Sequence, residues 1–220
     1  MTTKFKLISF WLLLTVGMTT VVFNSCGQEE KNVKNNSTTT DIGVVINSVK
    51  WATRNVDAFG TFAATPESFG MFYQWNRKIA WSATEPSAGI AIDNWDSSTP
   101  AGTTWEKSND PSPKGWRIPT KEEQQSLFDT EKVSNEWTTQ NGVTGRKFTD
   151  KATGNTLFLP AAGFRDRNNG SLGGEGTYGS YWSSSEYSSE DAYYLGFEND
   201  NTSVYFYNRL SGQSVRCVAE

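Results

Sequence analysis

The chain has 220 residues, of which 24 are acidic and 20 are basic, so its formal net charge is −4. This balance argues against a basic surface for nucleic acid or anionic lipid. The sequence has no histidine, which excludes Ser-His-Asp and Cys-His catalysis and histidine zinc sites. Its two cysteines, Cys26 and Cys217, do not make a framework of intrachain disulfides.

The first 25 residues have the pattern of a secretory signal. Lys4 and Lys6 precede an uncharged apolar run at 7–23. Threonines and a glycine interrupt this run, and it falls short of the roughly 20 apolar residues of a comfortable membrane span. A basic start, an apolar middle and small residues at the end predict a signal that is removed on secretion.

Cys26 directly follows this signal. Ser25-Cys26-Gly27 resembles the lipobox of bacterial lipoproteins, which implies that Cys26 is lipidated and anchors a surface-exposed protein to the outer membrane. An ordinary secretory signal with an incidental cysteine is the alternative. Residues 26–41 are polar with one apolar side chain, Val33, so we expect a flexible tether.

Residues 42–220 are enough for one well-buried domain. The β-branched alternation at 42–56 predicts an opening strand or hairpin. Thr65 and Pro66 suit the start of a short helix that runs toward Asn76. The span 80–114 has no clear period and is rich in Gly, Ser, Pro and Asp. We expect its three tryptophans to anchor it to the core, namely Trp81, Trp95 and Trp105.

A second helix is predicted to begin near Lys121, because Thr120 and Glu123 have the spacing of a capping box. Short strand-like runs follow, separated by Gly or Asn/Asp/Ser clusters that favour antiparallel hairpins. The runs are 146–150, 155–163, 178–186, 191–197, 202–208 and 212–220. The predicted fold class is α+β, with two short helices, a mostly antiparallel sheet and long loops.

Six motifs occur here in the same order as in the Fibrobacter succinogenes major paralogous domain family, which the chain therefore resembles. Members of this family are often Bacteroidetes surface lipoproteins. The motifs are VKWATRNVD, GMFYQWNR, DPSPKGWRIPT, LPAAGFRD, YWSSSE and SVRCV. The resemblance covers about residue 44 to the end and implies a C-type-lectin-like fold. It implies little about activity, because this fold hosts binding modules and enzymes alike.

Two positions depart from the family pattern. Many relatives carry cysteine at the positions of Arg54 and Ser112. Both cysteines are missing here together, as expected if they normally pair with each other. We therefore expect packing, with Trp51 and Trp116 as candidates, to hold the opening strand to the loop before the helix.

The resemblance suggests two chemistries that the residues support poorly. Calcium-binding lectins of this fold use an oxygen-rich loop; Glu198 and Asp200 are weak candidates, and a polar turn explains them equally well. Enzymes related to formylglycine-generating enzymes need reactive cysteines, whereas Cys217 occupies an alternating strand position that predicts burial. We therefore predict a non-catalytic protein without metal or cofactor.

The end of the chain is rich in aromatic residues. Alternation predicts that Tyr205 and Tyr207 lie on one face of a strand and Phe206 and Asn208 on the other, whereas Trp182 belongs to the core. Tyrosine mixed with serine, glycine and asparagine is typical of antibody-like binding surfaces. The predicted ligand-binding residues are Tyr193, Tyr194, Gly196, Ser203, Tyr205, Phe206, Tyr207, Leu210 and Ser211.

This composition also resembles the variable proteins of diversity-generating retroelements, in which mutated asparagine codons rewrite the end of the domain. We interpret the chain as a receptor or adhesin module for a protein or glycan ligand, membrane-attached through its lipid and without nucleic-acid partners. The alternatives are an edge hairpin whose aromatic residues pack on one another, and a structural or fimbria-associated surface protein.

Overall fold

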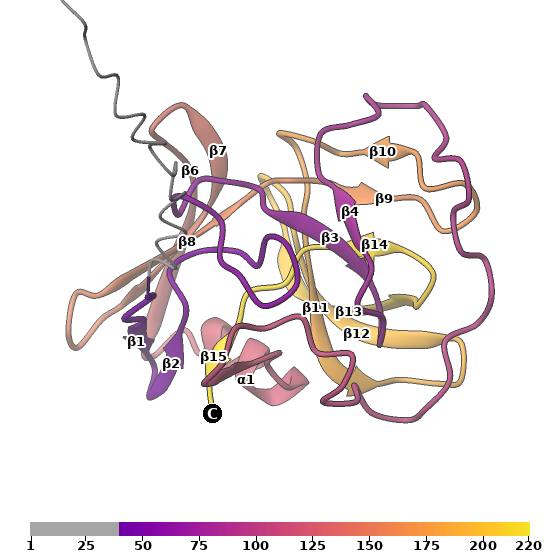
Figure 1. Cartoon of the computed structure of the whole chain (residues 1–220). Coiled ribbons are helices and arrows are strands. Elements are labelled where there is room, and N and C mark those ends of the chain that lie inside the picture. Colours follow the sequence, from indigo (N-terminus) through magenta and orange to yellow (C-terminus); the bar gives the residue numbers. More distant parts are fainter. Residues whose placement is uncertain (1–39) are drawn as a thin grey trace, which may run out of the picture. The chain divides into compact units, whose positions relative to one another are not determined.

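The computed structural model describes residues 40–220, and the strands of this part form four small sheets (Figure 1). Every strand pairing within these sheets is antiparallel. The first sheet contains, in spatial order, β1 (Val44–Ile46), β2 (Val49–Trp51), β15 (Val218–Ala219) and β5 (Trp116–Arg117). The second contains β10 (Leu172–Gly173), β9 (Phe164–Arg165), β14 (Gly212–Gln213), β3 (Met71–Gln74) and β4 (Ala80–Ser82).

The two remaining sheets are made of hairpins of consecutive strands. One contains β6 (Val133–Gln140), β7 (Val143–Asp150) and β8 (Thr156–Pro160). The other, called the terminal sheet here, contains β11 (Gly179–Glu186), β12 (Asp191–Phe197) and β13 (Thr202–Asn208). The strands predicted at 191–197 and 202–208 are thus confirmed. The strand at β6 was not predicted.

The predicted helix after Thr120 is confirmed as α1 (Lys121–Gln125), which continues into a 3-10 turn, η1 (Ser126–Phe128). The Thr120 hydroxyl accepts from the Glu123 N–H at 3.3 Å, and the Glu123 carboxylate accepts from the Thr120 N–H at 2.8 Å. The same carboxylate receives two bonds from Arg117, at 2.8 and 2.6 Å. This capping box with a charged partner explains why so short a helix forms where it does. No helix in the described part of the chain is long and apolar enough to cross a membrane.

The helix predicted from Thr65 toward Asn76 is wrong. Thr65 and Ser68 close a single turn through main-chain and hydroxyl bonds. Gly70 follows with a positive φ of 69°, and a Cβ there would lie 2.2 Å from the Val56 carbonyl oxygen. The chain then enters β3, which pairs with both β4 and β14. Tertiary strand pairing thus overrides the local helix signals, and the described domain is mostly sheet with one short α-helix.

The terminal sheet lies between two buried clusters. Tyr181, Leu195 and Phe197 belong to the first cluster, with residues of η1 and the β6–β8 sheet. Trp182 and Tyr194 belong to the second, which contains Tyr73, Trp75, Trp105, Val215 and Cys217. The predicted burial of Trp182 and Cys217 is confirmed, and desolvation raises the pKa of the Cys217 thiol. Both faces of this sheet therefore carry core side chains.

The opening strand is joined to the loop before α1 mainly through β15. Val218 pairs with Trp51 on one side and with Arg117 on the other. The Arg54 guanidinium, ion-paired with Asp41, lies 5.4 Å from the Phe62 ring centroid, and this ring meets Trp116 edge-on at 5.7 Å.

Of the two tryptophans expected to pack at this junction, the Trp116 side chain does so, whereas Trp51 joins it through its main-chain pairing with Val218 and packs its side chain in the first cluster. Asp41, placed in the tether by its sequence, is buried and accepts bonds from Gly43, Thr53 and Arg54, so the folded domain includes it.

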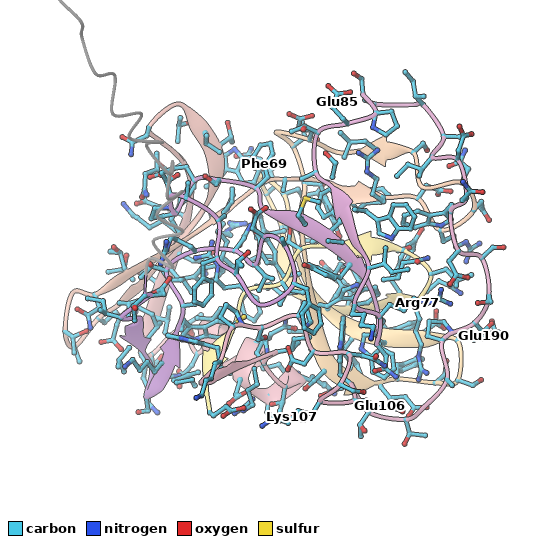
Figure 2. All side chains as sticks on the ribbon, viewed as in Figure 1. Phe69, Arg77, Glu85, Glu106, Lys107 and Glu190 are labelled. Atoms are coloured by element: carbon cyan, nitrogen blue, oxygen red, sulfur yellow. The ribbon has the colours of Figure 1, made fainter. Side chains whose placement is uncertain are left out.

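The span 83–115 lacks helix and strand elements, and it reaches from Glu85 at one end of the domain to Glu106 and Lys107 at the other (Figure 2). Its tryptophans hold it as predicted. Trp95 packs on Trp81 with ring centroids 4.8 Å apart, and its indole N–H donates to the Arg167 carbonyl at 3.0 Å. Trp105 meets Trp75 at 5.6 Å in the second cluster.

Arg165, on β9, binds the start of the same loop. Its fully buried guanidinium donates to the carbonyl oxygens of Ser82, Glu85, Pro86 and Gly170 at 2.8 to 3.3 Å. These contacts supply the bonds that water would otherwise make to the carbonyl groups.

We expect Arg165→Met to lower the free energy of unfolding by about 3 kcal/mol or more, because several buried carbonyl groups lose their donor at once. Urea denaturation measures the loss, and limited proteolysis should show new cleavage within 82–100. Arg167→Met is the matched control, since Arg167 is exposed. A loss of less than about 1 kcal/mol for Arg165→Met would show that the loop does not depend on this side chain.

Candidate functional site

The side chains of β12 and β13 divide between the two faces of the terminal sheet as their alternation predicts. Tyr194 lies opposite Tyr205 in the ladder, and Tyr193 lies opposite Phe206. One face, called the tyrosine face here, carries Tyr194, Gly196, Ser203, Tyr205 and Tyr207. Tyr193 and Phe206 lie on the opposite face. The nine predicted ligand-binding residues therefore do not form one surface.

The tyrosine face bears two neighbouring cavities. One, of about 280 Å³, is lined by Tyr178, Tyr194, Gly196, Phe197, Glu198, Asn201 and Tyr205. The other, of about 230 Å³, is lined by Phe164, Tyr178, Ser180, Tyr194, Tyr207 and Gln213. Tyr178 and Tyr194 line both, so this pair separates the cavities. We call the two cavities together the tyrosine groove.

Hydroxyl groups fix the rings of the groove. The Tyr178 and Tyr194 hydroxyl oxygens are 2.8 Å apart, and the Asn201 amide donates to the Tyr205 hydroxyl at 2.7 Å. Tyr194 is only 8% exposed, and its ring contacts those of Tyr205 and Tyr207 with centroids 5.9 and 6.3 Å away. Burial raises the pKa of both Tyr178 and Tyr194, so these hydroxyls stay neutral and remain able to donate.

Gly196 forms part of the groove floor. A Cβ at this position would lie 2.6 Å from the Tyr178 hydroxyl, 2.9 Å from a Tyr194 ring carbon and 3.0 Å from a Tyr205 ring carbon. The three rings therefore close over a residue that has no side chain, and any larger residue would displace them.

Tyr178 was missed by the sequence analysis. It precedes β11 by one residue, outside the aromatic segment from which the site was predicted, and no spacing connects it with Tyr194. Its ring is held by an edge-on contact with Phe164 at 6.0 Å.

The opposite face carries a separate exposed aromatic patch. Tyr187 stacks on Phe206 with centroids 3.8 Å apart and planes 5° apart, and it meets Tyr193 edge-on at 5.3 Å. The Lys121 ammonium lies 4.1 Å from the Tyr193 ring centroid. Tyr187 and Phe206 are 48% and 49% exposed.

The prediction of Ser211 as a ligand-binding residue is wrong, because its side chain is buried, and Leu210 lies beyond the end of β13. Ser211 is fully buried, and Leu210 is half-buried, with its carbonyl accepting from the Gln74 amide at 2.8 Å. The chain has left the edge strand by this point and turns inward to β14, which pairs with both β3 and β9.

The weak metal candidates lie in the turn between β12 and β13. Glu198 and Asp200 are exposed, and the Asp200 carboxylate accepts from the Asn199 amide at 2.7 Å. Arg146 donates to the main-chain carbonyl groups of Glu198 and Asn201 at 2.9 and 3.1 Å, which fixes the turn without an ion. Within residues 40–220, no three His, Cys, Asp or Glu side chains gather as a metal site requires.

The motifs that carry the family resemblance are mostly buried framework. Trp51, Trp75, Arg165, Trp182 and Arg216 come from five of them, and each is almost completely inaccessible. A sequence model of the Fibrobacter succinogenes major domain matches residues 24–219. The chain belongs to this family.

Membership in the Fibrobacter succinogenes major domain family says nothing about the tyrosine groove. No curated protein and no solved structure matches the chain. What the groove does must therefore be inferred from its own geometry.

Alkaline titration tests the burial of the tyrosines. Burial raises the pKa of Tyr181 to about 12 and also raises that of Tyr194, because it penalises the phenolate. The folded state thus favours neutral rings. Their contribution to stability is complete below the unfolded pKa of about 10 and is lost as the pH rises above it toward the folded values.

We expect the melting temperature to fall steadily above pH 10, and absorbance at 295 nm to show these tyrosines ionising only with unfolding. Tyr194→Phe should make the fall shallower than in the wild-type protein. An equal slope in the two proteins would contradict the burial of Tyr194.

Proposed function

We propose that the protein is a non-catalytic binding module of the cell surface that contacts its ligand through the tyrosine groove. We further propose that its domain has the C-type-lectin-like fold that the sequence motifs imply. The observation that carries the function is the pair of cavities on either side of Tyr178 and Tyr194. They combine aromatic walls with neutral hydroxyl and amide groups on a sheet whose two faces are both fixed by core packing.

The groove suits recognition by stacking and hydrogen bonding. Its rings are held by neighbouring rings and by hydroxyl bonds, so little side-chain entropy is lost when a ligand binds. Among residues 40–220, Glu198 is the one charged side chain that lines it. An uncharged polar surface, on either a glycan or a protein, fits such a site better than a strongly charged one.

We expect the β13 positions of the tyrosine face to tolerate sequence change, in contrast to Gly196 on β12. Ser203, Tyr205 and Tyr207 direct their side chains to the groove face, whereas their main-chain groups belong to the ladder. Substitution here changes the contact surface and leaves the strand pairing in place. Such tolerance is what diversification of this segment would require, and it supports the interpretation of the segment as a binding surface.

Binding is tested by removing one ring from each face of β13. Tyr207 and Phe206 are neighbours with similar exposure, 38% and 49%, but only Tyr207 lines the groove. We expect the protein to bind at least one probe on an array of neutral and acidic glycans and matrix proteins. Tyr207→Ala should then weaken that binding at least tenfold, whereas Phe206→Ala should change it less than twofold. Equal losses, or no loss with Tyr207→Ala, would contradict the assignment of the groove.

We also propose that Cys26 anchors the protein to the outer membrane as a lipoprotein. The cysteine and the polar segment after it lie outside the described residues, so the proposal rests on Ser25-Cys26-Gly27 after an apolar run. Cys26→Ser should release the protein from the membrane fraction when cells are fractionated, and wild-type protein should label with radioactive palmitate. Unchanged membrane attachment of Cys26→Ser would refute the anchor.

A further inference from the structure

β13 is an edge strand, and the hydrogen bonds at its two ends show which of its residues direct their main-chain groups toward β12. The Glu198 N–H donates to the Asn201 carbonyl at 2.9 Å, and the Arg209 N–H donates to the Glu190 carbonyl at 2.9 Å. These bonds mark hydrogen-bonded pairs at both ends of the β12–β13 ladder. Because bonded and non-bonded pairs alternate in an antiparallel ladder, Ser203, Tyr205 and Tyr207 direct their main-chain groups toward β12.

The main-chain groups of Thr202, Val204 and Phe206 therefore point away from the sheet. Among the described residues, neither a strand, nor a loop, nor a side chain forms a hydrogen bond with them. The other edge of the same sheet is different. On β11, Trp182 donates to the Ser214 carbonyl at 3.0 Å and Ser184 donates to the Pro119 carbonyl at 2.8 Å. One edge is thus covered by the protein itself, and the other is open.

The open edge also lacks the features that prevent strands from pairing between molecules. Edge strands are usually protected by lysine, proline, a bulge or short length. The sequence of β13, TSVYFYN, contains no charged residue and no proline, and its seven-residue register with β12 is unbroken. β6, another long edge strand, carries Glu136 in an ion pair with Lys147.

We propose that β13 pairs with β13 of a second copy of this chain, antiparallel and about a two-fold axis at Tyr205. The two terminal sheets would then form one continuous sheet of six strands. In this register Val204 of each copy exchanges hydrogen bonds with Phe206 of the other, and Thr202 lies opposite Asn208.

Three features favour a second copy as the occupant. The register uses the outward-pointing groups of Val204 and Phe206 on both strands, while Thr202 faces Asn208, whose carbonyl already accepts from the Ser211 N–H at 3.0 Å. A β-branched residue meets an aromatic one at Val204 and Phe206, a favourable cross-strand pair. Because β13 is uncharged, no like charges within it oppose each other. An isologous contact of this kind closes on itself.

The two-fold axis allows a site-specific cross-linking test on the full chain in membranes. In the proposed dimer Tyr205 lies opposite Tyr205 of the other copy in a non-hydrogen-bonded pair. The Cα atoms of such a pair are about 4.5 Å apart, which is within the range for a disulfide. Tyr205→Cys should therefore give a disulfide-linked dimer under mild oxidation. Tyr207→Cys is the matched control on the same face. In the proposed dimer this position lies opposite Ser203, about 13 Å along the strand from residue 207 of the other copy. The variant should therefore stay monomeric.

A second variant keeps the test independent of Tyr205. Ser203→Cys combined with Tyr207→Cys retains the Tyr205 ring and should cross-link, since the two positions oppose each other. Adding Val204→Pro, which removes an outward N–H without breaking a bond to β12, should reduce this cross-linking at least tenfold. Val204→Ala should not reduce it.

The wild-type chain, with Cys26 and Cys217, provides the background under the same oxidation. Absence of cross-linking in both test variants, or equal cross-linking in the Tyr207→Cys control, would overturn the proposal. Insensitivity to Val204→Pro would also overturn it. Because the assay needs no ligand, its outcome is independent of the tyrosine groove.

Discussion

The buried guanidinium groups are the interactions on which the rest of this domain depends. Arg165 binds four carbonyl groups around the long loop, and Arg216 binds the Asn55 amide oxygen at 2.9 Å and the Ala52 carbonyl at 3.3 Å. Arg209 donates to the Gly102 carbonyl at 2.8 Å, forms an ion pair with Glu186 at 3.0 Å and lies 4.2 Å from the Trp75 ring centroid. Arg165 and Arg209 each satisfy several main-chain acceptors, mostly in loops, whereas Arg216 satisfies one main-chain carbonyl and one side-chain amide oxygen.

This arrangement explains how a domain with so much loop remains ordered. A carbonyl group removed from water costs free energy unless it finds a donor, and one guanidinium supplies up to five N–H groups in a fixed geometry. Arg209 is particularly well placed, because its partners lie in the loop around Gly102 and in the turn between β11 and β12. That turn carries Tyr187, so the same side chain indirectly positions the aromatic patch opposite the groove.

The terminal sheet owes its aromatic content to its position as a central layer. Phe197 and Tyr194 lie on the same strand but serve different clusters, one on each face of the sheet. Many of the aromatic residues that suggested a contact surface are thus needed for packing. The proposed groove occupies the rim of the second cluster, where Tyr205 and Tyr207 extend beyond the core and Tyr178 completes the wall. The proposed groove and the core therefore share side chains, and truncation of the more deeply packed rings would disturb both.

The sequence by itself determined the local features of this protein. The Thr120–Glu123 capping box and the alternating strands at 191–197 and 202–208 formed as predicted, because their signals lie within a few residues. Tertiary structure decided the rest. Pairing with β14 and β4 made a strand where Thr65 and Pro66 had favoured a helix. Ser211 became buried and Tyr178 joined the groove through contacts between segments distant in the chain, which no local periodicity can encode.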